Sequence, residues 1–99
     1  MKMKNPSRPG LMVGNIIIDL EITVTQAAKL LGVTRQNLSN LIHKNTASVS
    51  PEMAMRLEAV FGSTAESWLR NQASYDASII RQRAEEIQDG LNRFQPDAA

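Results

Sequence analysis

Cysteine is absent from this 99-residue chain, and histidine occurs only once, as His43. Without thiols the chain can form no disulfide, zinc–thiolate site or cysteine nucleophile, and it needs no oxidising compartment. The single histidine and the lack of paired acids in a recognisable catalytic arrangement argue against an enzyme. We therefore expect a binding protein that uses neither a metal nor a cofactor.

Long apolar runs are also absent. No stretch approaches the roughly 18 consecutive apolar residues of a membrane-spanning helix. The basic N-terminus is not followed directly by an uninterrupted apolar segment and a cleavage site, because the apolar residues after Gly10 lead into Asp19 and Glu21. This pattern predicts neither a signal peptide nor a membrane partner. We expect a cytoplasmic protein, and the chain length favours one domain.

The net charge is only +1, but the charges are unevenly distributed. The first fifty residues contain six basic and two acidic side chains, whereas the remainder contains five arginines and eight acids. A basic half suits a polyanion, and an acidic half suits a protein partner or plain solvent. Chance is the alternative explanation of this imbalance.

Helical patterns recur along the chain. Residues 1–8 lack periodicity and are predicted to form a flexible basic arm. The apolar segment from Pro9 to Leu20 contains three consecutive isoleucines, which would also suit a strand, but no partner strand is visible elsewhere. We therefore predict an all-α fold of five or six helices. Residues 9–76 are expected to form the domain, and residues 77–99 a C-terminal helix or tail.

Two short helices are predicted around Gly32. Thr25 is expected to be the N-cap of a helix over residues 26–31, and Thr34 the N-cap of a second helix that ends near His43. Glycine tolerates the left-handed backbone that ends many helices, so Gly32 is expected to stop the first helix.

The spacing of small and apolar residues agrees with a helix-turn-helix motif. Ala28 lies where the second helix must cross the first closely, and Val33 fills the turn. Leu38 and Leu41 are placed to hold the second helix against the first. Helical hairpins in general share this pattern, so the polar face of the second helix is needed to support the prediction.

Further helices are predicted downstream. Residues 50–52, Ser-Pro-Glu, combine an N-cap, a proline that loses no hydrogen bond and an acid near the positive helix end. This helix is expected to end at Gly62. Ser63 and Thr64 compete for the cap of the next helix, which residues 76–78 are expected to break or bend.

The exposed face of the second motif helix carries uncharged hydrogen-bonding side chains and one arginine. Arginine can pair with guanine and the amides with adenine at the base edges of the major groove. We predict that bases are read chiefly by Arg35, Gln36 and Asn40, and next by Asn37 and Ser39. Hydroxyls, amides and helix N-termini can hold phosphate. The predicted phosphate contacts are Thr25, Gln26, Thr34, Lys44 and Asn45. A merely solvated polar face is the alternative.

Near the C-terminus, apolar residues recur at spacings of four and three. They are Ile80, Ala84, Ile87, Leu91 and Phe94. This stripe resembles a heptad pattern, but it spans barely two heptads and includes Gly90. It predicts a C-terminal amphipathic helix that either packs on the domain's own core or forms a possible interface, with a second copy or another protein, through Ile80, Ala84, Ile87 and Leu91.

Several stretches resemble one known family. They are RPG, TQAAKLLGVTRQNLSNLIHKN, SVSPEMAMRLEAVFG and ESWLRNQASYD, which together cover about residues 8–76. The SPEMAxRL pattern followed by WLxxQ and YD is far more specific than the helix-turn-helix alone. In these stretches the sequence resembles the HigA-type antitoxins, within the larger phage-repressor-like helix-turn-helix group.

The resemblance implies a small, lambda-repressor-like, all-helical domain. It implies an antitoxin that neutralises a RelE-like toxin, an endoribonuclease that cleaves messenger RNA. It further implies a homodimer that binds double-stranded DNA at a palindrome in the promoter of its own operon and acts as a repressor. Two alternatives stay open: a stand-alone phage-type transcriptional regulator without a toxin, and a protein-only adaptor that works through residues 80–94.

The resemblance also bears on single residues. Repressors of this group use the positions of Arg35, Gln36 and Asn40 to read bases. A glutamine often opens the first motif helix and holds phosphate, but this chain has Val24 there. The phosphate contact is therefore expected to move to one of the two residues that follow.

Overall fold

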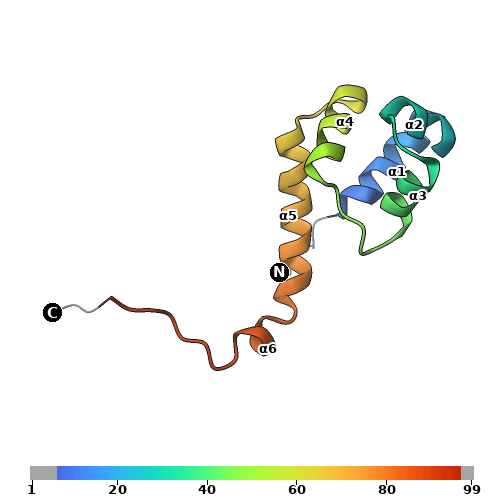
Figure 1. The fold of residues 1–99 in the computed structure, drawn as a ribbon. Helices are drawn as coiled ribbons and strands as arrows, with labels where there is room; N and C mark the ends of the chain where they lie inside the picture. Colours follow the sequence, from blue (N-terminus) through green and yellow to red (C-terminus); the bar gives the residue numbers. More distant parts are fainter. Residues whose placement is uncertain (1–6, 97–99) are drawn as a thin grey trace.

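The computed structural model describes residues 7–96, which form six α-helices and no strand. The helices are α1 (Pro9–Asp19), α2 (Val24–Leu31), α3 (Arg35–His43), α4 (Pro51–Phe61), α5 (Ala65–Arg81) and α6 (Ala84–Gln88). Figure 1 shows α1 to α4 gathered in one globule, with α4 beside the first part of α5 and the last part of α5 leading away from it. The predicted all-α fold is confirmed, and the three consecutive isoleucines lie in a helix.

The core lies among α1 to α4 and the start of α5. Its buried apolar side chains come from all five helices and from the α3–α4 connection: Val13, Ile17, Ala27, Ala28, Leu31, Leu38, Leu41, Ile42, Val49, Ala54, Leu57, Ala65 and Trp68. Burial of a large apolar side chain stabilises the fold by roughly 1.5–3 kcal/mol. The Trp68 ring also donates its Nε1–H to the carbonyl of Gly62 at 3.1 Å, so its polar group is satisfied in the core.

Helix starts follow the capping pattern in most places. Thr34, Ser50 and Thr64 are the N-caps of α3, α4 and α5, and each side-chain oxygen accepts a backbone N–H three residues on. Pro51 occupies the first position of α4, as predicted. Thr64 rather than Ser63 caps α5.

The predicted cap of α2 is wrong. Thr23, not Thr25, is the N-cap, and its hydroxyl accepts the N–H of Gln26 at 3.0 Å. The Gln26 side chain in turn accepts the N–H of Thr23 at 2.8 Å. This reciprocal pair satisfies two otherwise unpaired donors, whereas Thr25 lies one residue inside the helix and lacks that arrangement.

The predicted break at residues 76–78 is also wrong, because α5 runs through them. The Gln72 amide donates to the Asp76 carboxylate at 2.9 Å, and the Ser78 hydroxyl donates to the carbonyl of Tyr75 at 2.7 Å. Side chains that often compete with the helix are therefore bonded along it. The domain limit predicted at residue 76 lies inside this continuous helix.

The apolar stripe near the C-terminus does not lie on one helix. Helix α5 ends at Arg81, α6 covers only Ala84–Gln88, and Gly90 follows with φ +78°. Leu91 and Phe94 are 69% and 83% exposed, and Ile80 and Ile87 are about half exposed. Packing of this stripe on the domain's own core is therefore wrong, and its use as an interface stays a prediction.

The predicted flexible arm covers residues 1–8, of which 1–6 lie outside the described residues. For Arg8 the prediction is wrong, because its side chain is only 3% exposed. It donates two hydrogen bonds to the end of α3, so it belongs to the folded domain.

Within residues 7–96, no single helix has both the length and the apolar composition to cross a membrane. Only α1 and α2 taken together meet both criteria, across a bend of 111°.

Candidate nucleic-acid interface

Helix α3 has an apolar rear and a polar front. Leu38 is fully buried, and Leu41 and Ile42 are 4% and 7% exposed, so these three side chains anchor the helix to the core. Arg35, Gln36 and Asn37 are exposed on the first turn, and Ser39 and Asn40 are half-buried. The five predicted base readers thus all lie on one short helix of nine residues. An α-helix with its side chains is roughly 10–12 Å in diameter, which suits the roughly 12 Å width of a major groove.

Gln36 and Asn40 are joined to each other on this front. The Gln36 Nε2 donates to the Asn40 Oδ1 at 3.0 Å, one helical turn apart. The bond leaves the Gln36 carbonyl, its second amide hydrogen and the Asn40 amino group available. An amide needs one acceptor and one donor to pair with adenine, and Gln36 keeps both. The hydrogen bond therefore leaves Gln36 with the donor and the acceptor that reading a base requires.

A groove of about 270 Å³ runs beside α3. Asn37 and Asn40 line it on the side of α3, and Ser48 and Ser50 line it on the side of the α3–α4 connection. Ser50 was predicted only as an N-cap, and Ser48 was not singled out, because its only signal was a hydroxyl-rich loop before a proline. Both serines add polar groups next to the predicted base readers.

The predicted phosphate contacts lie at three helix ends, and all five are exposed. Thr25 and Gln26 lie in the first turn of α2, and Thr34 precedes α3. Lys44 and Asn45 follow α3 at its other end. The structure thus places donors at both ends of the helix that would lie in the groove. Gln26 uses its carbonyl oxygen in the α2 cap, which leaves its amino group as the donor.

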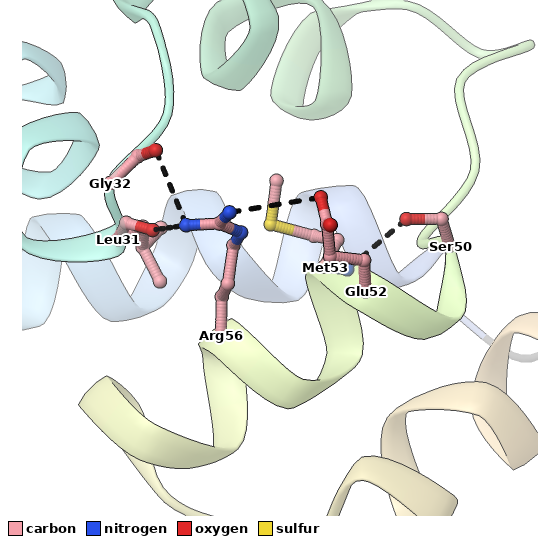
Figure 2. Close-up of polar contacts among 6 residues, drawn as sticks. All are labelled: Leu31, Gly32, Ser50, Glu52, Met53 and Arg56. Atoms are coloured by element: carbon pink, nitrogen blue, oxygen red, sulfur yellow. Dashed lines mark hydrogen bonds and ion pairs between the residues drawn. The ribbon is translucent and has the colours of Figure 1, made fainter.

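Arg56 holds the turn of the motif, as Figure 2 shows. Its Nη1 donates to the carbonyls of Leu31 and Gly32 at 2.9 and 3.2 Å, so α4 holds the C-terminal end of α2. Gly32 has φ +72°, and a Cβ there would lie 2.7 Å from Arg56 Nη1. The left-handed backbone therefore favours glycine, and a side chain at this position would also displace the Arg56 guanidinium.

Glu52 completes this contact at 3.7 Å from Arg56 Nη2. Its side chain is 82% exposed, so the ion pair contributes little, and the two carbonyl bonds matter more. Arg56 was not singled out in the sequence. The signal was nevertheless present, because Arg56 is the arginine of the SPEMAxRL pattern.

The connection after α3 is fixed to α5. The backbone N–H of Val49 donates to the Gln72 Oε1 at 2.9 Å, and Gln72 is only 5% exposed. Gln72 is in turn bonded to Asp76. These two residues belong to the WLxxQ and YD patterns, so both patterns contribute to the contact that holds the α3–α4 connection.

The predicted interface residues divide into two sets. Ile80, Ala84 and Ile87 line one hollow of about 260 Å³ where α5 meets α6. Leu91 does not line this hollow and lies beyond α6. No group of three or more potential metal ligands of the His, Cys, Asp and Glu types occurs within residues 7–96.

A family model for the helix-turn-helix matches residues 16–69, more than half of the chain. The chain belongs to the helix-turn-helix family. The match contains α2 and α3 together with the turn that Arg56 holds.

Related proteins and solved structures resemble this helix-turn-helix protein over most of its length. Virulence-associated protein A' of Dichelobacter nodosus is 42% identical over 80 residues, which are 80% of this chain and 69% of that protein. The structure of antitoxin GraA is 26% identical with a TM-score of 0.82, covering 93% of this chain and 100% of that one. The Pseudomonas aeruginosa antitoxin HigA, solved with the higBA promoter, has a TM-score of 0.77 at 21% identity. That match covers 91% of this chain and 99% of the other and shows a common fold. The predicted resemblance to HigA-type proteins is thereby confirmed.

Proposed function

We propose that this helix-turn-helix protein is an antitoxin that binds the promoter of its own operon as a dimer, represses it and neutralises a RelE-like, mRNA-cleaving toxin. The observation that carries the DNA-binding part is the bonded Gln36–Asn40 pair on the exposed front of α3. A solvated face needs no such ordered amides, whereas base reading requires side chains held in a defined geometry.

In this proposal α3 enters the major groove with its N-terminal turn against the bases. Arg35 donates to guanine, and Gln36 and Asn40 recognise adenine, while Asn37 and Ser39 add contacts at the flank. The buried rear of α3 supports the reading geometry because Leu38 and Leu41 fix the helix against the core.

Phosphate contacts would fix the register of α3 on the duplex. Thr25, Gln26 and Thr34 would hold one strand from the starts of α2 and α3, and Lys44 and Asn45 the other strand from the end of α3. Their exposure at opposite ends of α3 supports this arrangement.

Dimerisation is proposed through the hollow between α5 and α6. Ile80 and Ile87 expose apolar surface there, which a second copy would cover. Arg81 precedes the acidic pair Glu85 and Glu86, so a two-fold axis can place the basic part of one copy opposite the acidic part of the other. Two recognition helices would then read two half-sites of one palindrome.

The antitoxin role rests on the likeness to GraA and HigA, whose names state that role for those proteins. The toxin would be encoded next to this gene as a short basic protein. The acidic second half of the chain suits such a partner through charge complementarity.

The decisive experiment is to footprint the purified protein on the DNA upstream of its own gene, with and without the product of the adjacent reading frame. We expect protection of a palindrome with half-sites about one helical turn apart. The same adjacent product should arrest growth when expressed alone, and co-expression of this chain should restore growth.

Each rival has a separate outcome. Specific DNA protection without growth rescue would favour a stand-alone regulator. Binding to the adjacent product with no affinity for the promoter at low salt would favour a protein-only adaptor. Absence of both activities would contradict the whole proposal.

A further inference from the structure

Arg8, directly before α1, contacts the end of α3. Its side chain is 3% exposed, and its Nη1 and Nη2 donate to the carbonyls of Leu41 and Ile42 at 2.7 and 2.6 Å. Both ion pairs found within residues 7–96 belong to other arginines. The guanidinium is therefore held by backbone carbonyls, and these belong to the last turn of α3.

The last turn of an α-helix is where such a contact has most effect. Its carbonyls lack partners within the helix, and the negative end of the helix dipole attracts a cation. The planar guanidinium fork can bond two successive carbonyls at once. The Asn40 carbonyl, one residue earlier, already accepts the N–H of Lys44 at 2.8 Å. Arg8 thus supplies hydrogen-bond donors to two further carbonyls at the end of α3.

The two residues after Arg8, Pro9 and Gly10, leave space for its contact with α3. Pro9 begins α1 and is buried, and Gly10 follows. A Cβ at Gly10 would meet both the Leu41 carbonyl oxygen and the Arg8 guanidinium. Any larger residue would therefore displace the guanidinium from the carbonyls of α3. The RPG sequence therefore forms one unit that joins the start of α1 to the end of α3.

We infer that Arg8 is a positioning residue for base reading: by holding the carbonyls of Leu41 and Ile42, it fixes the rotation and axial position of α3. This inference rests on the proposed function, because α3 must read bases for its position to matter. Base readers need their geometry within about half an ångström, so a small shift of α3 should reduce sequence discrimination. Binding to phosphate, which tolerates such shifts, should change much less.

The test compares Arg8→Gln, Arg8→Lys and Gly10→Ala with the unchanged protein. Arg70→Gln, which removes an exposed arginine of α5, is the matched charge control. For each protein the dissociation constants for the operator and for random duplex DNA are measured over a range of salt concentrations. Circular dichroism and Trp68 fluorescence report the fold. Titration with operator DNA gives the fraction of each protein that is able to bind DNA.

We expect Arg8→Gln to lower the ratio of operator to random-DNA affinity by roughly tenfold or more, as when a base contact is weakened. The salt dependence should stay unchanged, because no phosphate contact is lost. Gly10→Ala should have the same effect with Arg8 still present. Arg8→Lys should restore the ratio in part, since an ammonium can hold a carbonyl but lacks the fork. Arg70→Gln should match the unchanged protein.

Other results would overturn the inference. A phosphate contact by Arg8 would reduce the salt slope by roughly 0.9 per site and weaken operator and random DNA alike. A purely structural role would lower the active fraction and leave the affinity ratio unchanged. Failure of the unchanged protein to discriminate its operator would instead overturn the proposed function itself.

A measurement on the unchanged protein covers the case in which the variants do not fold. The guanidinium protons of Arg8 should exchange slowly with solvent in the absence of DNA, and random DNA should not shift their NMR signals. Rapid exchange, or a shift on adding random DNA, would overturn the inference.

Discussion

At the level of single residues, α3 has a buried apolar face and an exposed polar face. Leu38, Leu41 and Ile42 are buried and carry the packing energy. Arg35 and Gln36 are exposed, and we propose that they read bases. Because the two sets do not overlap, substitutions of the exposed polar residues should alter DNA recognition with little effect on stability. Substitutions of the buried apolar residues should lower stability with little direct effect on recognition.

Arg35→Ala should relax specificity by about 1–3 kcal/mol at one base pair in each half-site, because the guanidinium would no longer donate to guanine. Gel shifts on single-base operator variants measure this loss. Lys44→Ala is the contrast, since it should weaken all sequences alike and reduce the salt slope by roughly one unit per half-site. An unchanged base preference in Arg35→Ala would contradict its assignment.

Gln36→Ala and Asn40→Ala should not be additive in their effect on operator affinity. The two amides share a hydrogen bond at 3.0 Å, so removing one also releases the other. Residues in direct contact show coupling energies of about 0.5–3 kcal/mol. A double-mutant cycle measured on the preferred operator gives this coupling. Strict additivity would show that the pair does not act as a unit on DNA.

At the level of elements, short helices depend strongly on their ends. Helix α2 has only eight residues, and its first turn relies on the reciprocal bonds between Thr23 and Gln26. Its last turn relies on Gly32 and on the Arg56 guanidinium that holds the carbonyls there. Local capping therefore secures the start of α2, and a contact from α4 reinforces its end.

Thr23→Ala should lower the free energy of unfolding by about 1 kcal/mol, the usual cost of losing an N-cap hydroxyl. Thr25→Ala changes the same residue type two positions later, outside the cap, and should cost much less. Urea denaturation of the two variants checks the difference. Equal losses would contradict the assignment of the cap to Thr23.

Gly32→Ala should destabilise the protein by about 1–3 kcal/mol, because alanine is strained at φ +72° and its Cβ would displace Arg56. Gly62→Ala is an informative comparison: a Cβ added there would meet no atom within 4 Å, but φ +93° and ψ −166° lie in a region that essentially only glycine adopts. The larger loss is expected at Gly62, because alanine tolerates the left-handed helical backbone of Gly32 better. Thermal unfolding, followed through Trp68 fluorescence, measures both.

At the level of the whole molecule, the C-terminal part extends away from the globule. The molecule measures 62 Å along its longest axis and 28 and 27 Å across, and Figure 1 shows that the end of α5, α6 and the segment after them account for this length. Apolar side chains on this extension are exposed. Such a shape is expected of a part that becomes covered on assembly.

Ile87→Asp should convert the proposed dimer into a monomer, because a charge would be placed in the hollow between α5 and α6. The fold should persist, since Ile87 is 45% exposed and lies outside the core. Operator affinity should fall by about 10²–10⁴-fold when the two half-sites are no longer bound together. Sedimentation velocity and gel shifts measure both effects. Ser74→Asp adds the same charge to an exposed position of α5 and should leave the dimer intact, and a dimeric Ile87→Asp would contradict the interface.

The sequence by itself determined those features that depend on neighbouring residues. Helical periodicity placed Leu38 and Leu41 on the inner face of α3, and local chemistry identified Thr34 and Ser50 as caps and Gly32 as the turn. The same reasoning failed at α2, because two threonines lie close together and the side chain of Gln26 selects the first of them.

Only the tertiary structure decided the long-range contacts. The sequence assigned Arg8 to an arm because residues 1–8 lack periodicity, but a carbonyl that Arg8 contacts lies 33 residues away. The bond between Gln72 and Val49 spans 23 residues and cannot be read from periodicity. The C-terminal stripe has the spacing of a packed helix and yet stays exposed, because burial depends on whether another element lies opposite it, which sequence spacing does not encode.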